Sequence, residues 1–194
     1  MHQQQVALAV PRPLPLARAW FAVARYAVAG MPLLARGHVR STGELVGTRM
    51  RFADGTSALV YRETRLDSGT AVDPCALVVA FRLRAVREYG HTVFRWVSPL
   101  NTPLFVGFPG FRSKLWLAAD EHGVYRGVYE WDGTVRAVHY ARSLWRVLAL
   151  VSVPGSIRYT VRPGLHRDDL VRSASPGGTE AFREDGWWLP VSGR

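Results

Sequence analysis

The sequence predicts an α+β fold whose main part is a β-α-β-β-α-β unit, the ferredoxin-like pattern, over residues 76–163. Residues 108–131 alternate apolar and polar side chains on both sides of a turn at 120–123, which is typical of a β-hairpin. Residues 134–152 repeat apolar side chains at helical spacing. The apolar segments 76–86 and 156–161 predict the first and last strands of the unit, and a helix is expected at 88–97.

The strand period assigns the hairpin side chains to faces. On the first strand it places Lys114 and Trp116 on one face and Phe111 and Leu115 on the other. On the return strand one face carries Tyr125, Gly127, Tyr129 and Trp131.

The remaining chain is expected to form an N-terminal extension (1–75) and a tail (164–194). The extension holds a helix over 16–29, which Gly30 and Pro32 are expected to end. A hairpin follows over 45–66, with Asp-Gly at its turn. The tail carries Trp187 and Trp188, which we expect to dock on the body or to form part of an interface.

Composition excludes several classes of function. The net charge of +10 is the balance of 24 arginines and one lysine against 15 acidic residues. The basic residues are scattered without a basic run, so nucleic-acid binding is not expected. The single cysteine, Cys75, precedes an apolar strand and is expected to be a small buried hydrophobe. The N-terminus lacks the layout of a signal peptide, which favours the cytoplasm. Arg18 and Arg25, one heptad apart, favour an amphipathic helix on the protein or a membrane surface over a membrane span.

Two short motifs carry a resemblance to a known family. Pro109-Gly110-Phe111 leads into the hairpin, and Gly127-Val128-Tyr129-Glu130-Trp131 ends it directly before a helix. This arrangement resembles the dimeric α+β barrel superfamily, including antibiotic-biosynthesis-monooxygenase-like and YdhR-like proteins. The resemblance implies a homodimer that joins two sheets into a barrel, with a pocket between each sheet and its helices. Activities in the superfamily include cofactor-free oxidation of aromatic polyketides, haem degradation, dismutation of small anions and binding without a known reaction.

The haem-degrading branch of that family uses a histidine on the second helix as iron ligand. His139 lies in the corresponding region, but Tyr140 occupies the place near which the family has a tryptophan. Haem is therefore not expected, and no cofactor is predicted. A metal is not expected either, since His166 beside Asp168 and Asp169 has no second histidine at ligand spacing.

Three residues are candidates for catalysis. His91 could act as a general base, because the ordinary pKa of histidine lies near neutrality. A structural His91 would instead hydrogen-bond a backbone carbonyl group. Lys114, the only lysine, can lose its proton or form a Schiff base, whereas a structural Lys114 would pair with Glu130 or Asp120. Tyr129 could hold a substrate carbonyl.

A second set of residues could line a pocket for a flat, apolar small molecule. These residues are Trp96, Asn101, Trp116, Tyr125, Trp131, His139 and Tyr140. A plain core or a dimer interface would use the same aromatic residues, and Asn101 could equally cap a turn.

The sequence thus leaves three hypotheses. The first is an enzyme that acts without metal on an apolar, enolisable substrate, as a cofactor-independent monooxygenase or a cyclase or isomerase. The second is a non-catalytic module for ligand binding or dimerisation. The third is a peripheral membrane protein that lays the helix of residues 16–29 on anionic lipid.

Overall fold

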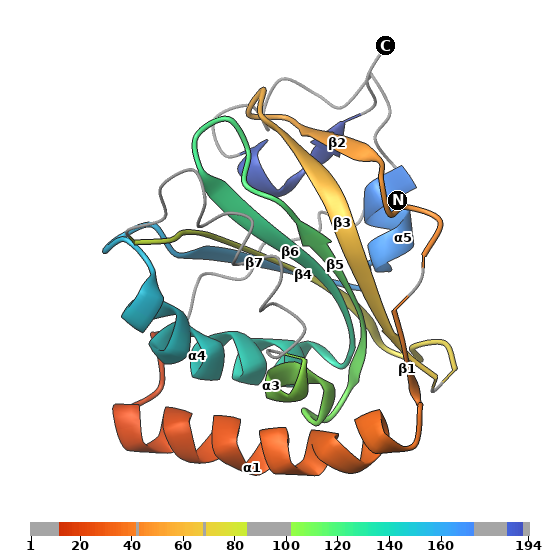
Figure 1. Cartoon of the computed structure of the whole chain (residues 1–194), viewed down its shortest axis with the longest axis vertical. Helices are drawn as coiled ribbons and strands as arrows, with labels where there is room; N and C mark the ends of the chain where they lie inside the picture. Colours follow the sequence, from red (N-terminus) through yellow and green to blue (C-terminus); the bar gives the residue numbers. More distant parts are fainter. Residues whose placement is uncertain (1–11, 42, 68, 85–101, 173–185, 192–194) are drawn as a thin grey trace.

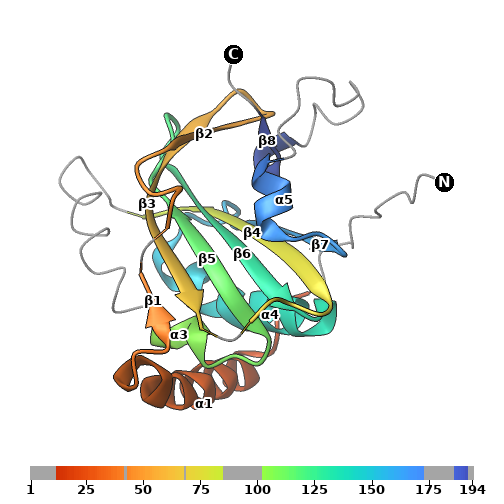
Figure 2. The same cartoon turned by 90° about the vertical axis from the view of Figure 1, so that its right-hand side faces the viewer.

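The computed structural model describes residues 12–41, 43–67, 69–84, 102–172 and 186–191. In these residues the chain is an α+β protein with a strongly curled, eight-stranded antiparallel sheet. Two long helices, α1 and α4, lie on one side of the sheet (Figure 1). The curl of the sheet is plain in the second view (Figure 2), where β3, β5, β6 and β4 follow one another around it.

Four strands form the unit predicted from the sequence. They are β4 (Pro74–Arg82), β5 (Phe111–Leu117), β6 (Val124–Asp132) and β7 (Arg158–Pro163). Their order in the sheet is β7-β4-β6-β5, and every neighbouring pair is antiparallel, as the β-α-β-β-α-β pattern requires.

Two helices belong to this unit in the described chain. Helix α4 (Thr134–Val151) joins β6 to β7 and confirms the helix predicted at 134–152. A four-residue helix, α3 (Pro103–Val106), leads toward β5. The helix expected at 88–97 lies outside the described residues.

The N-terminal hairpin continues the same sheet. Strands β2 (Arg49–Phe52) and β3 (Ser57–Leu66) pair as predicted, and Gly55 in their turn has a φ of 84°. Strand β3 pairs with β5 on one side and with the short β1 (Val39–Arg40) near its end. The residues before β4 and the unit after them therefore share one sheet.

Helix α1 (Leu16–Ala35) runs beyond the predicted end at Gly30, and Pro32 lies inside it. Gly30 does not stop the helix because its role is close packing. A side chain at Gly30 would lie 3.0 Å from the amide nitrogen of Gly107, and one at Gly107 would overlap the carbonyl oxygen of Tyr26. In the described residues, no helix has both the length and the apolar character needed to cross a membrane.

The sheet has a core on each face. The core between the sheet and the helices contains Leu77 and Val79, whereas Ala76 and Val78 face the opposite core. The tail covers this opposite face with α5 (Arg167–Arg172), the 3₁₀ helix η3 (Gly186–Trp188) and β8 (Pro190–Val191). Two tail tryptophans, Trp187 and Trp188, are buried there, which confirms that the tail docks on the body.

The faces predicted for the hairpin are correct with one exception. Trp116 faces the helices and Leu115 faces away from them. Phe111 was assigned to the face of Leu115, and this prediction is wrong. The pairing register of β5 and β6 shifts between Phe111 and Ser113, so Phe111 faces the helices and its ring lies 5.6 Å from that of Trp131.

Candidate functional site

Lys114 is buried on the helix-covered face of the sheet, among three aromatic rings. Only 7% of the residue is exposed. Its Nζ lies 3.1 Å from the centre of the Trp116 ring and 4.8 Å from the ring centres of both Phe105 and Tyr129. These contacts define the lysine cage: Lys114, Phe105, Trp116 and Tyr129.

The backbone makes room for this cage at Gly127. Lys114 on β5 lies opposite Tyr129 on β6, and Gly127 is the neighbouring position on the same face of β6. A Cβ at Gly127 would lie 2.8 Å from the Tyr129 ring and 3.2 Å from Cε of Lys114. The missing side chain at Gly127 is therefore what allows both side chains to lie over the strand.

The predicted pairing of Lys114 with Asp120 or Glu130 is wrong. Asp120 pairs with Arg126 at 2.6 Å, and Glu130 lies 3.1 Å from Nδ1 of His166. Glu130 also belongs to the other face of the hairpin, since successive residues of a strand point to opposite sides. In the chain as described, no carboxylate forms an ion pair with Lys114. Burial, with a smaller contribution from the charge of Arg62, holds the pKa of Lys114 well below its ordinary value.

Two tyrosine hydroxyls lie beside the cage. Tyr140 on α4 donates a hydrogen bond of 3.3 Å to the hydroxyl oxygen of Tyr129. Burial raises the pKa of both phenols, so both stay protonated at neutral pH. Because Tyr129 accepts this bond, its own hydrogen remains available to an acceptor within the cage.

A second cation lies at the edge of the cage. Cζ of Arg62 lies 5.5 Å from the centre of the Trp116 ring, and the indole nitrogen of Trp116 donates to Oγ1 of Thr64 at 2.9 Å. Arg62 donates through Nη2 to Thr102 at 3.2 Å, while its buried Nη1 has no hydrogen-bond partner among the described residues. Burial lowers the pKa of this guanidinium.

The other predicted site residues are placed in different surroundings. Trp131 is fully buried against Tyr140, with ring centres 4.8 Å apart, and belongs to the core. Tyr125 lies four residues from Tyr129 along β6, about 13 Å by strand geometry, where it stacks on Phe81. Three predicted residues, His91, Trp96 and Asn101, lie outside the described residues.

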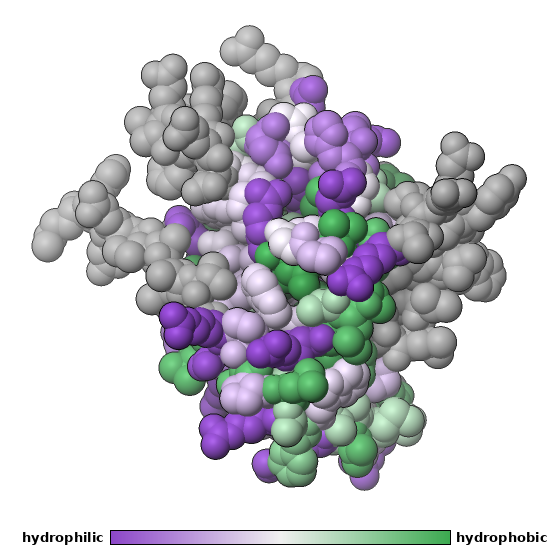
Figure 3. Space-filling model, turned by 90° about the vertical axis from the view of Figure 1, so that its left-hand side faces the viewer, coloured by the Kyte–Doolittle hydropathy of each residue, from purple (hydrophilic) through white to green (hydrophobic). Residues whose placement is uncertain are grey.

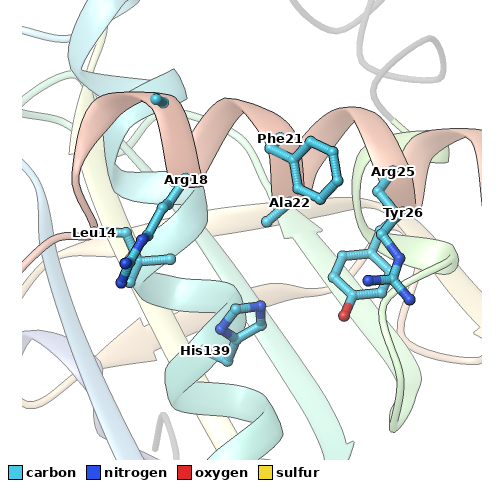
Figure 4. Close-up of a pocket in the computed structure, with 8 residues that line it drawn as sticks. Leu14, Arg18, Phe21, Ala22, Arg25, Tyr26 and His139 are labelled. Atoms are coloured by element: carbon cyan, nitrogen blue, oxygen red, sulfur yellow. The ribbon is translucent and has the colours of Figure 1, made fainter.

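His139 faces away from the lysine cage, toward α1. It lines a groove of about 610 Å³ between α1 and α4. Figure 4 shows Arg18 and Arg25 extending from α1 on the side where His139 lies. Burial, followed by the charge of Arg142, lowers the pKa of His139. The complete lining of the groove is Leu14, Ala17, Arg18, Phe21, Ala22, Arg25, Tyr26 and His139.

This groove was not predicted from the sequence. The one feature of the sequence that points to this groove is the heptad spacing of Arg18 and Arg25, which places both on one side of the helix. His139 joins them only because α1 and α4 pack side by side (Figure 1), a contact between segments more than a hundred residues apart.

A polar pocket of about 490 Å³ lies between the sheet and α5. His166 lines it and is held by Glu130, and Asp168 beside it binds Arg167 at 2.8 Å. Among the described residues, no group of three His, Cys, Asp or Glu side chains is arranged to hold a metal ion.

Known proteins resemble this chain only distantly. No protein-family model matches the chain, and no curated protein matches it. One solved structure similar to part of the chain is a crystal structure described as a study of an anthrone oxidase-like protein. The match has 14% sequence identity and a TM-score of 0.38, and it covers 57% of this chain. The chain spans 55% of the length of that protein.

Proposed function

We propose that this protein is an enzyme that removes a proton from an apolar, enolisable carbonyl compound, with Lys114 as the base and Tyr129 as the donor to the carbonyl oxygen. The observation that carries the proposal is the buried amine of Lys114, enclosed by three aromatic rings with no carboxylate paired to it in the described chain.

The surroundings of Lys114 favour a chemical role over a structural one. Burying an amine away from water without an opposite charge lowers the stability of a protein, and an apolar side chain of similar length would fill this space at less cost. Groups held in such surroundings gather at functional sites. The other 24 basic residues of the chain are arginines, which cannot release a proton near neutral pH.

The cage supplies the parts of a proton abstraction. The neutral amine of Lys114 accepts a proton from the carbon next to a carbonyl group, and the electron pair of the broken C–H bond moves to the carbonyl oxygen. The hydroxyl of Tyr129 donates to that oxygen, and the nearby charge of Arg62 favours the enolate. Phe105 and Trp116 keep water away from the amine.

The enolate has three possible fates that start from this same step. Protonation at another carbon isomerises the substrate, and attack on a second carbonyl cyclises it. Reaction with molecular oxygen inserts one oxygen atom and releases the other in water, which is the cofactor-independent monooxygenase reaction expected from the family resemblance. The proposal concerns the shared proton abstraction.

The predicted homodimer is also a proposal. In the described chain, α5 and the two tail tryptophans cover the sheet face that would meet a partner sheet in a barrel. Strand β7 ends the sheet on one side, so a second copy would add there. Sedimentation equilibrium measures whether the chain forms a dimer.

The exchange of hydrogen for deuterium tests the enzyme proposal. We expect the protein to accelerate deuterium uptake from D₂O at the α-carbon of 2-tetralone, an apolar bicyclic ketone. Lys114→Met and Lys114→Arg are expected to lower this rate about a hundredfold or more, and Tyr129→Phe by less. The matched control, Arg51→Met, removes an exposed cation and should keep the rate.

Two results would contradict the proposal. One is exchange that survives Lys114→Met in a folded variant. The other is tight binding of 2-tetralone without any exchange, which would instead support a non-catalytic ligand-binding module.

A further inference from the structure

The outward side of α1 is apolar along its whole length. Large side chains that a packed helix would bury are exposed on it. Their exposed fractions are 56% for Leu16, 42% for Trp20, 69% for Phe21, 72% for Val28 and 57% for Met31. Figure 3 shows green, hydrophobic side chains gathered along the lower edge of the molecule, at the level of α1, with purple ones between them.

The charges of α1 have one sign. Its sequence from Leu16 to Ala35 contains two arginines and no acidic residue. Arg18 and Arg25 are exposed, and in the part of the chain that the structure describes neither forms an ion pair. Their guanidinium groups extend to one side of the helix and border the groove shared with α4 (Figure 4).

An apolar face with unpaired cations has two natural occupants, a second copy of the chain or a lipid surface. Two copies of α1 placed face to face would bring four arginines together without any acidic residue on either helix. Because like charges repel in a desolvated contact, this charge pattern opposes self-association through α1. An anionic bilayer neutralises the same arginines and buries the same apolar side chains.

We propose that α1 docks the protein on the surface of an anionic lipid bilayer. The helix lies parallel to the membrane, with Phe21 and Val28 at the level of the acyl chains and Trp20 at the interface. Arg18 and Arg25 bind lipid phosphates at the mouth of the groove, and the net charge of +10 adds a general attraction. This proposal concerns a different surface from the lysine cage and does not depend on it.

Flotation of the full chain with lipid vesicles tests this surface. We expect the protein to float with vesicles of phosphatidylcholine and phosphatidylglycerol at low salt, and to remain in solution with phosphatidylcholine alone. The variant Arg18→Gln/Arg25→Gln should bind about fivefold more weakly for each arginine removed. The matched control, Arg51→Gln/Arg82→Gln, removes two exposed arginines of the sheet and the same charge, so it should lose much less binding.

The apolar contribution has its own pair of variants. Phe21→Ser/Val28→Ser should reduce flotation with anionic vesicles, whereas Val72→Ser/Val135→Ser, at positions that are 91% and 82% exposed outside α1, should leave it unchanged. Circular dichroism checks that each variant is folded. Absence of flotation with anionic vesicles would overturn the proposal, as would equal losses in test and control variants. A dimer that the α1 variants convert into monomers would assign the face to a second copy instead.

Discussion

Lys114 and Tyr129 occupy directly opposite positions on β5 and β6, and their side chains share the space that Gly127 leaves open. The turn between the two strands brings together residues that are 15 positions apart in the chain, and the pleat directs both toward α3 and α4. The same hairpin that organises the sheet thus sets the geometry of the lysine cage.

The burial of Lys114 predicts how stability depends on pH. Its pKa in the folded protein lies well below the ordinary value of 10.5. At a pH between the pKa of Lys114 in the folded protein and its ordinary pKa in the unfolded chain, the unfolded chain binds more protons than the folded one. The free energy of unfolding therefore rises with pH in this range, by up to about 1.4 kcal/mol per pH unit from this residue. Urea unfolding at several pH values from 6 to 9 measures the slope.

The variant Lys114→Met isolates that contribution. It removes the titrating amine and keeps most of the side-chain volume, so its stability advantage over the unmodified protein should be largest at pH 6 and should shrink toward pH 9. A constant difference across this range would mean that the amine titrates normally. NMR of protein labelled at lysine Cε gives one signal from Lys114 and reports its titration directly.

The buried ion pair of Asp120 and Arg126 should contribute more to stability than any exposed pair. The carboxylate of Asp120 is fully buried and also accepts bonds from the amides of His122 and Val124. Asp120→Ala leaves the buried Arg126 charge with one acidic partner, the partly exposed Asp54 at 3.1 Å. We expect a loss of about 3–5 kcal/mol in the free energy of unfolding.

The exposed pair of Arg40 and Asp67 provides the control. Its side chains are 67% and 55% exposed, and we expect Asp67→Ala to cost about 1 kcal/mol or less. Urea unfolding of both variants measures the two losses. Similar losses would contradict the view that burial decides the strength of these pairs.

The sequence predicts those parts of the fold that local periodicity determines. The hairpins, α4 and the faces of β6 follow from the spacing of apolar residues and from turn glycines such as Gly55. The end of α1 could not be predicted because Gly30 serves a contact with Gly107, which lies 77 positions away in the chain. The face of Phe111 was missed because a register shift has no signal in the alternation of side chains.

The candidate site was predicted less completely than the fold. That Lys114 is the only lysine marked it in the sequence, but its burial depends on Phe105. The nearby acids Asp120 and Glu130 are occupied by Arg126 on β6 and by His166 in the tail. Arg126 also donates to the carbonyl oxygen of Trp187 at 3.0 Å, a partner 61 positions away. Pairing of this kind is fixed by tertiary structure, so residue type and spacing alone left Asp120 open as a partner of Lys114.

The close contact of α1 with the end of α3 predicts a cost for adding a single methyl group. Gly107 has an ordinary helical backbone conformation, so alanine is not strained by its φ. Its Cβ would nevertheless overlap the carbonyl oxygen of Tyr26 and push α1 away. We expect Gly107→Ala to lower the free energy of unfolding by about 1–3 kcal/mol in urea titrations.

Gly30→Ala tests the same contact between α1 and α3 with a smaller steric overlap than Gly107→Ala. Its Cβ would lie 3.0 Å from the amide nitrogen of Gly107, which requires a smaller shift, and alanine favours the helix by up to about 1 kcal/mol. The loss should therefore be smaller than at Gly107. If both variants were as stable as the unmodified protein, α1 and α3 would lie farther apart than the structure shows.

The thiol of Cys75 is predicted to be unreactive in the folded protein. The residue is fully buried within β4, as expected for a small hydrophobe, and burial raises the pKa of its thiol to about 11. Because the thiolate is the reactive form, Ellman's reagent at pH 8 should label the native protein very slowly and label it fully in denaturing urea. Val72→Cys supplies the control, since that position is 91% exposed and should add one thiol that reacts within the mixing time. Rapid native labelling of the unmodified protein would mean that the strands around β4 open often enough to expose the core beneath the lysine cage.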